Sequence, residues 1–161
     1  IERGIGIDLS HDMLAYARAN LDDAGLMNCQ IRLGDMYRLP LDDASFDAVT
    51  IHQVLHYADE PAKVIFEAAR VLRPGACLMI ADFAPHGLEQ LRAEHAHRRL
   101  GFGDDEVADW CRDAGLEIEA VRTLEGEPLT VKIWVAINSG ALPPDPPTAG
   151  TGRDLRTAVA S

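Results

Sequence analysis

The sequence predicts an α/β fold in which a doubly wound, mostly parallel sheet is followed by an antiparallel hairpin. Two patterns carry this prediction. Segments typical of strands alternate with segments of helical periodicity as far as residue 83, in the order strand, helix, strand, strand, helix, strand. Two further strand-like segments, separated by a short polar turn, then close the structured part of the chain.

The first predicted unit is a strand that ends at Asp8 and leads directly into a helix. Ser10 is placed to cap that helix, and Leu9 can pack against Leu14 across the cap as a hydrophobic staple. We expect the helix to end at Gly25, because glycine readily adopts the left-handed conformation of a helix terminus.

The later elements show the same signals: strand-like and helical segments alternate, capping residues precede the helices, and glycine or proline marks where elements end. A helix is expected to open at Pro61, and the apolar run "ACLMIADF" is typical of a parallel strand covered on both faces. In chain order, we expect strands over 29–33 and 46–51, a helix over 61–73, a strand over 76–83, a polar helix over 89–101, a helix over 104–114, and hairpin strands over 116–124 and 129–138.

Length and composition are those of one domain with enough apolar residues to build a core. The 26 acidic and 15 basic residues give a formal charge of -11, which disfavours direct contact of this segment with nucleic acid. No apolar run reaches membrane-spanning length, so we expect a cytoplasmic protein without a membrane partner. The three cysteines are odd in number and far apart, which favours reduced thiols. The proline- and glycine-rich residues 139–161 are expected to form a disordered tail.

Acidic residues follow two of the predicted strands, at the edge where parallel α/β sheets bind ligands. A carboxylate such as that of Asp8 can accept hydrogen bonds from both hydroxyls of a ribose. The carboxylate of Asp35 can accept from the amino group of an adenine, while Met36 offers an apolar face to the ring. Together these residues predict an adenosine site. Taken singly, an acidic residue after a strand is more often a helix cap or a turn residue.

Three stretches carry a resemblance to a known family: "GIDLSHDMLAYAR", "GDMYRLPLDDASFDAVTIHQVLHYADEP" and "EAARVLRPGACLMIADF". In this order and spacing they resemble the class I S-adenosylmethionine-dependent methyltransferases, especially the small-molecule type related to the ubiquinone and menaquinone C-methylases. The resemblance spans roughly residues 5–137. It implies a Rossmann-like methyltransferase sheet with a C-terminal antiparallel hairpin, and S-adenosylmethionine as the cofactor without a metal. The cofactor-binding residues that it implies are Asp8, Leu9, Gly34, Asp35, Met36 and His52.

The resemblance also implies a segment that the sequence does not contain. The family's first strand and its glycine-rich loop are expected before residue 1, and that strand would lie between the strands that end at Asp8 and near His52. We therefore expect residues 1–138 to be a partial methyltransferase domain at the carboxyl-terminal end of a longer protein. On its own, such a chain is expected to fold poorly, to bind the cofactor weakly and to be inactive.

A narrower resemblance covers an insertion at about residues 84–103. Its stretches "FAPH" and "EHAHRRLGF" are similar to bacterial proteins that fuse an ArsR-type winged-helix repressor to a methyltransferase domain. This resemblance implies that any contact with DNA is made by a winged helix outside this chain, and it is compatible with a homodimer.

Histidines are the candidates for acid–base chemistry. Methyl transfer from a sulfonium is an in-line displacement, so a general base is needed only where the nucleophile carries a proton of high pKa. The sequence offers His52 and His56 after the predicted strand 46–51, and His97 with two further histidines in the insertion. His56 is as readily a packed or capping residue. The spacing of His52 and His56 also occurs in helical zinc sites, but no third ligand is evident nearby.

Three functions stay open on the sequence alone. The first is an enzyme that methylates an unidentified small-molecule acceptor. The second is a non-catalytic sensor of S-adenosylmethionine or S-adenosylhomocysteine within a transcriptional regulator. The third is a nicotinamide-dependent oxidoreductase, which Asp8 would suit but which neither Asp35 nor the terminal hairpin favours.

Overall fold

The computed structural model describes residues 2–140 and confirms the α/β alternation, while residues 141–161 of the expected tail lie outside the described part. Within residues 2–140, none of the helices combines the length and the apolar character needed to cross a membrane. The elements are β1 (Gly4–Asp8), α1 (His11–Asp23), β2 (Cys29–Leu33), β3 (Phe46–His52), the short 3-10 helix η1 (Leu55–Tyr57), α2 (Pro61–Val71), β4 (Leu72–Phe83), α3 (Gln90–Glu94), α4 (Asp104–Asp113), β5 (Leu116–Leu124) and β6 (Val131–Asn138).

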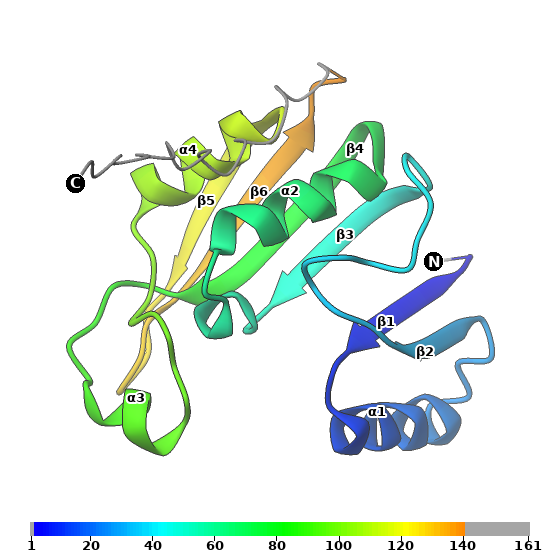
Figure 1. The fold of residues 1–161 in the computed structure, drawn as a ribbon, viewed down its shortest axis with the longest axis horizontal. Coiled ribbons are helices and arrows are strands. Elements are labelled where there is room, and N and C mark those ends of the chain that lie inside the picture. The colour runs from blue at the N-terminus through cyan, green and yellow to red at the C-terminus, as the bar shows by residue number, and fades with distance from the viewer. Residues whose placement is uncertain (1, 141–161) are drawn as a thin grey trace, which may run out of the picture.

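The strands form two sheets (Figure 1). β1 and β2 pair in parallel, with Asp8 opposite Leu33. The second sheet has the order β3-β4-β6-β5, in which β3 and β4 are parallel and β6 runs antiparallel to both of its neighbours. The predicted hairpin is therefore confirmed, and its last strand is inserted between β4 and β5.

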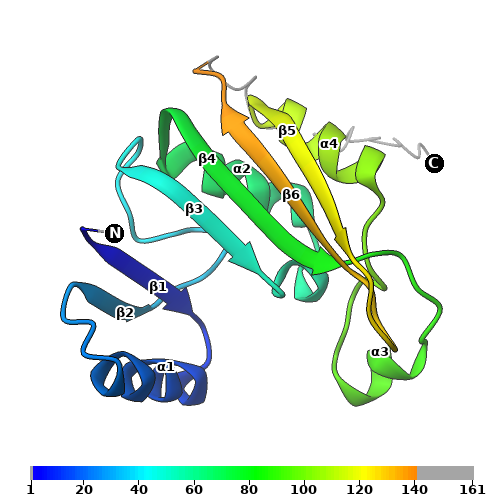
Figure 2. The same ribbon diagram turned by 180° about the vertical axis from the view of Figure 1, so that it is seen from behind.

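The two sheets lie side by side without a hydrogen-bonded ladder between them in the described residues. β1 and β3 run in the same direction along the facing edges, as the views from both sides show (Figures 1 and 2). Each of these edges carries backbone N–H and C=O groups that a further strand could pair with. The family resemblance places one strand at this position, and that placement stays a prediction.

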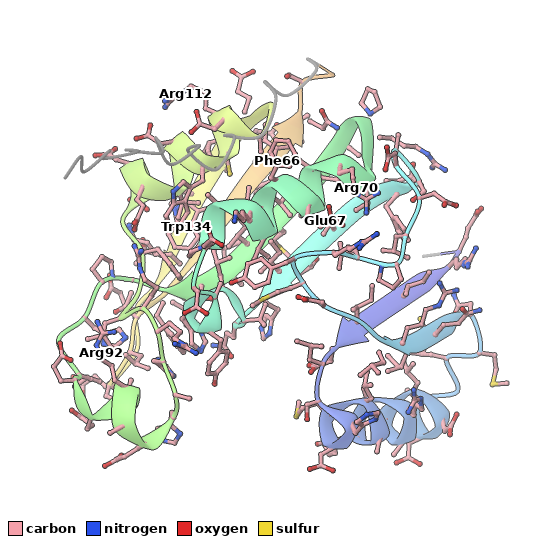
Figure 3. All side chains as sticks on the ribbon, viewed as in Figure 1. Phe66, Glu67, Arg70, Arg92, Arg112 and Trp134 are labelled. Carbon is pink, nitrogen blue, oxygen red and sulfur yellow. The ribbon has the colours of Figure 1, made fainter. Side chains whose placement is uncertain are left out.

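The main hydrophobic core lies on one face of the four-stranded sheet, under α2 and α4. Trp134 of β6 is fully buried on that face (Figure 3), and Leu78 and Ile80 of β4 are buried beside it. The opposite face of β4 is more open, because Met79 is 36% exposed and Cys77 is half-buried. The expectation that this strand is covered on both faces is therefore wrong for the described residues.

Two helix boundaries also differ from the sequence-based expectation. α2 ends at Val71 rather than near Pro74, where the carbonyls of Arg70 and Val71 accept hydrogen bonds from the amides of Ala44 and Ser45. These loop amides satisfy carbonyl groups that a longer helix would have used internally. The expected helix over 89–101 is only the five-residue α3, because the backbone of Ala96 takes a positive φ of 55°.

We predict that Leu78→Ala lowers the free energy of unfolding by about 2–5 kcal/mol, because it opens a cavity in the buried face of β4. Met79→Ala, one residue along on the open face, is the matched control and should cost less than about 1 kcal/mol. Urea denaturation of the full-length protein measures both values. Equal losses for the two variants would contradict the one-sided core.

Candidate functional site

Asp8 and Asp35, the two acidic residues of the predicted adenosine site, lie at neighbouring strand ends of the two-stranded sheet. Asp8 is the last residue of β1 and pairs with Leu33, the last residue of β2. The amide of Gly34 donates to the carbonyl oxygen of Asp8 at 3.1 Å, and Asp35 follows directly. The structure thus places the two acidic residues that the sequence singled out at neighbouring strand ends.

Asp8 uses one carboxylate oxygen to organise the turn into α1. Its Oδ1 accepts a hydrogen bond from the amide of Ser10 at 2.7 Å, and the Ser10 hydroxyl caps α1 by accepting from the amide of Met13 at 3.3 Å. Asp8 is half-buried, and within residues 2–140 its other carboxylate oxygen has no hydrogen-bond partner. Leu9 is 61% exposed while Leu14 is buried, so the expected staple between them does not bury Leu9.

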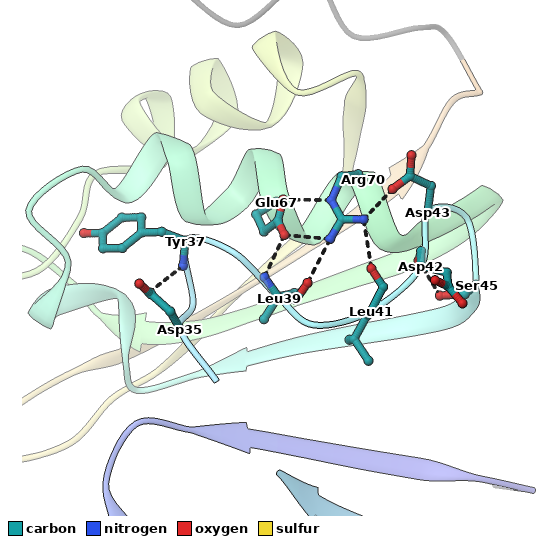
Figure 4. A network of polar contacts seen from close by, with 9 residues as sticks. All are labelled: Asp35, Tyr37, Leu39, Leu41, Asp42, Asp43, Ser45, Glu67 and Arg70. Carbon is teal, nitrogen blue, oxygen red and sulfur yellow. Dashed lines mark hydrogen bonds and ion pairs between the residues drawn. The ribbon is translucent and has the colours of Figure 1, made fainter. Parts of the chain in front are cut away.

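Asp35 has a similar local geometry at the end of β2. Its Oδ1 accepts from the amide of Tyr37 at 2.9 Å (Figure 4), and its second oxygen has no partner in the described part of the chain. The side chain is exposed, whereas that of Met36 is half-buried and packs partly against the hydrophobic core. Met36 therefore has a structural role beside the predicted contact with an adenine ring.

Gly34 is required by a close approach between the loop and β1. A Cβ atom at this position would lie 2.7 Å from Cγ2 of Ile7 and 3.1 Å from Cδ of Pro40. Any larger residue would push the loop away from the strand end. The glycine therefore keeps Asp35 beside Asp8.

A part-buried network holds the segment from Asp35 to Ser45, which we call the connecting loop because it joins β2 to β3. Glu67 and Arg70 point from α2 toward this loop (Figures 3 and 4). Oε1 of Glu67 accepts from the amide of Leu39 at 2.7 Å. The guanidinium of Arg70 uses all five of its N–H groups, which donate to both carboxylate oxygens of Glu67, to Asp43, and to the carbonyls of Leu39 and Leu41.

The electrostatics of this network keep the guanidinium charged. Hydrogen bonding to Glu67, followed by that to Asp43, raises the pKa of Arg70 above its ordinary value despite partial burial. A five-donor planar fork matches several acceptors at once, which an ammonium group cannot do. The network therefore holds residues 39–43 of the connecting loop against α2.

A second polar group is buried at the carboxyl end of the four-stranded sheet. Asp82 of β4 is fully buried and its carboxylate accepts four hydrogen bonds. The donors are the ring Nδ1 of His56 at 2.8 Å, the amide of Leu55 at 3.0 Å, the amide of His56 at 3.3 Å and the amide of Phe83 at 2.8 Å. Because a carboxylate only accepts, Nδ1 of His56 carries the proton.

The insertion brings His97 against this pair. The rings of His56 and His97 lie 4.2 Å apart, and His97 stacks on Phe83 at 5.8 Å with an interplanar angle of 13°. His86 meets the same Phe83 ring edge-on at 6.1 Å. Nδ1 of His97 and Nε2 of His86 are buried and have no partner among residues 2–140.

Burial and neighbouring imidazoles favour the neutral forms of the insertion's two buried histidines. Burial is the main cause that lowers the pKa of His97 and of His86 below its ordinary value, and the charge of His56 adds to it. For His97, the negative charge of Asp82 acts in the opposite direction. The pKa of the Asp104 carboxyl on α4 is also lowered, chiefly by its hydrogen bond to Lys132.

The candidate histidines separate into two places. His52 is exposed at the end of β3, whereas His56 is buried in η1, so the two are not ligands on one helix face. The described residues contain no group of three or more side chains that could hold a metal ion. Of the arginines beside His97, Arg98 pairs with Asp59 at 3.2 Å, and Arg99 pairs with Glu106 and lies 5.6 Å from the Phe102 ring centroid.

Sequence reasoning missed Asp82, Phe83 and the pair formed by Glu67 and Arg70. A signal for Asp82 was present, because it stands at the carboxyl end of a predicted parallel strand just as Asp8 and Asp35 do. The sequence shows only the i,i+3 spacing of Glu67 and Arg70, because the loop acceptors of Arg70 lie about thirty residues away.

Comparison with known proteins gives the family. Residues 2–80 match the family described as "Methyltransferase domain". A ubiquinone biosynthesis O-methyltransferase of Leptothrix cholodnii is 24% identical over 149 residues, which cover 84% of this chain and 63% of the relative. A 27-O-demethylrifamycin SV methyltransferase of Amycolatopsis mediterranei is 37% identical over 130 residues, covering 71% of this chain and 46% of the relative. The chain thus spans less than two thirds of these relatives.

The solved structures agree on the fold. A geranyl diphosphate methyltransferase in complex with S-adenosylmethionine superposes with a TM-score of 0.72 at 14% identity, covering 84% of this chain and 68% of that one. The resemblance of the insertion to winged-helix fusions stays a prediction. The matched residues and the named relatives support a class I S-adenosylmethionine-dependent methyltransferase, and the solved structure shares its fold.

Proposed function

We propose that the protein transfers a methyl group from S-adenosylmethionine to a small-molecule acceptor, and that Asp8 and Asp35 bind the adenosine part. The observation that carries the proposal is the pair of adjacent carboxylates at the ends of β1 and β2, each with one oxygen without a partner in the described residues. The names of the two relatives given above refer to ubiquinone and to a rifamycin, which are small molecules. They support a small molecule as the methyl acceptor.

The residues present fit the adenosyl group. Both carboxylates keep an acceptor oxygen at one strand edge, and ribose hydroxyls and an adenine amino group are the donors that such oxygens bind. Leu9 beside them is exposed and apolar, and His52 is exposed at the end of β3. When bound, the cofactor supplies an electrophilic methyl group on a positively charged sulfur.

The connecting loop positions Asp35 in this proposed site. Asp35 lies on an exposed turn. If the loop around it were flexible, ordering that loop on binding would weaken the affinity for the cofactor. The network of Glu67 and Arg70 fixes that loop before any ligand arrives. We therefore assign Arg70 a positioning role in cofactor binding.

The other functions inferred from the sequence become outcomes of the experiments. Binding of the adenosyl ligands without methyl transfer to any tested acceptor would favour the sensory function. Binding of NAD would favour an oxidoreductase. A winged-helix segment, a homodimer, a cytoplasmic location, a disordered tail and inactivity of the chain on its own remain sequence-based predictions.

We predict that Asp8→Asn and Asp35→Asn each weaken S-adenosylmethionine binding by about 10- to 100-fold. A hydrogen bond to a charged group contributes about 1.5–3 kcal/mol, which corresponds to that factor. Calorimetric titration of the full-length protein measures the dissociation constants. Asp12→Asn, in the exposed first turn of α1, is the matched control and should bind like the wild type. Unchanged binding in both site variants would overturn the adenosine site.

We predict that Arg70→Lys lowers the free energy of unfolding by about 1–3 kcal/mol, because several loop acceptors lose their donors while the charge is kept. The same variant should weaken S-adenosylmethionine binding severalfold. Arg73→Lys changes only the donor of an exposed ion pair with Asp47 and should change neither quantity measurably. Urea denaturation and calorimetry give both readouts. A stability loss without any loss of affinity would refute the positioning role.

A further inference from the structure

The turn that carries Asp35 is closed by its own hydrogen bonds. The amide of Tyr37 donates to Oδ1 of Asp35 at 2.9 Å, and the amide of Arg38 donates to the carbonyl oxygen of Asp35 at 3.1 Å. These bonds set the shape of the turn but do not tie it to the rest of the protein. The amide of Gly34 holds the chain on one side of the turn, and the network of Arg70 holds the loop from residue 39 onward. Residues 35–38 lie between these two anchored points.

The side chain of Tyr37 supplies a contact from this turn to α2. Its hydroxyl oxygen accepts a hydrogen bond from the amide of Glu60 at 3.2 Å. Glu60 is the N-cap residue of α2, and Figure 4 shows the tyrosine ring extending toward the beginning of that helix, away from Arg70. The ring is half-buried and packs partly against the hydrophobic core. Tyr37 therefore connects an exposed turn to the helix that covers the main core.

The amide of Glu60 is one that the helix itself leaves without an acceptor. The first four N–H groups of a helix have no partner within it, and a capping side chain usually satisfies one of them. The side chain of Glu60 makes no capping hydrogen bond, and Pro61 has no N–H. The Tyr37 hydroxyl accepts from the Glu60 amide instead. The contact thus ends on a backbone group held in place by a helix whose Ile65 is fully buried.

Tyr37 links the Asp35 carboxylate to this fixed point within a single residue. Its amide holds one carboxylate oxygen of Asp35, and its hydroxyl is held by the amide at the start of α2. A movement of the Tyr37 backbone would therefore carry the Asp35 side chain with it. The contacts of Arg70 differ, because they begin further along the loop, at the carbonyl of Leu39.

We propose that Tyr37 is a positioning residue through which the site selects adenine over a base that has a carbonyl in place of the amino group. This inference rests on the proposed function, in which Asp35 accepts from the adenine amino group. A carboxylate oxygen only accepts hydrogen bonds, so it binds an amino group and repels a carbonyl oxygen placed opposite it. Such discrimination requires that the oxygen stays directed at the base. Tyr37 keeps it there by anchoring the turn to α2.

Calorimetry of the full-length protein with two ligands tests the inference. S-adenosylhomocysteine carries the amino group, whereas S-inosylhomocysteine carries a carbonyl at that position. The wild type should bind the adenosyl ligand at least about tenfold more tightly. Tyr37→Phe, which removes only the hydroxyl oxygen, should weaken adenosyl binding by about two- to tenfold and leave inosyl binding within about twofold. Equal losses for the two ligands, or no loss for either, would overturn the inference.

A matched control and a double variant separate positioning from general damage to the fold. Tyr16→Phe, on the exposed side of α1, should bind both ligands like the wild type. When Asp35→Asn is already present, Tyr37→Phe should change adenosyl affinity by less than about twofold, because the carboxylate that it positions is gone. Fully additive losses would assign Tyr37 a merely structural role and would overturn the inference.

Hydrogen exchange of the protein without ligand tests the anchor itself. In Tyr37→Phe, the amides of residues 37 and 38 should lose protection, because the turn has lost its contact with α2. The amide of Leu39 should keep its wild-type protection, because Glu67 still holds it. Unchanged protection of the turn, or an equal loss at Leu39, would contradict the anchoring role.

The two possible failures are distinguishable. If Asp35→Asn weakens adenosyl binding while Tyr37→Phe leaves the preference for the adenosyl ligand intact, only the inference about Tyr37 fails. If the wild-type protein binds neither S-adenosylmethionine nor S-adenosylhomocysteine, the proposed function fails and the inference fails with it.

Discussion

The buried carboxylate of Asp82 is the group on which the carboxyl end of the four-stranded sheet depends. An isolated carboxylate in a protein interior costs several kcal/mol, so its donors have to stay together. Those donors come from η1 and from the end of β4, and one of them is the ring of His56. Because the carbonyl of His56 in turn receives two amides of the insertion, the same charge also fixes where the insertion packs.

The three aspartates at strand ends differ in how fully their oxygens are used. Asp82 has both oxygens satisfied by protein donors and is completely buried, so it organises structure. Asp8 and Asp35 each spend one oxygen on the turn that holds them and keep the other without a partner in the described residues. A carboxylate that is held by one oxygen and open at the other is suited to bind a ligand, because its orientation is fixed before binding.

The sequence was sufficient for the order of elements, the capped helix at Ser10 and the final hairpin, because local alternation and capping determine these features. It also placed Asp8 and Asp35 together, since a parallel pair brings strand ends to one edge. It failed for the helix expected over 89–101, where packing of His97 against His56 overrides helical propensity. The network around Arg70 and the two carboxylate oxygens at Asp82 depend on contacts between distant segments, which no local pattern reveals.

The division into two sheets gives the connecting loop its importance. Asp8 and Asp35, the proposed adenosine-binding residues, lie at the end of the two-stranded sheet, whereas His56 and His97 pack at the end of the four-stranded one, and in the described residues no ladder joins the two sheets. Methyl transfer demands that donor and acceptor be aligned to within a fraction of a bond length. In the described chain, three hydrogen bonds from Arg70 hold the loop that connects the two sheets, and two more join Arg70 to Glu67 on the same helix. Arg70 contacts neither Asp8 nor Asp35, so we infer that it acts on the proposed cofactor site only through the position of this loop.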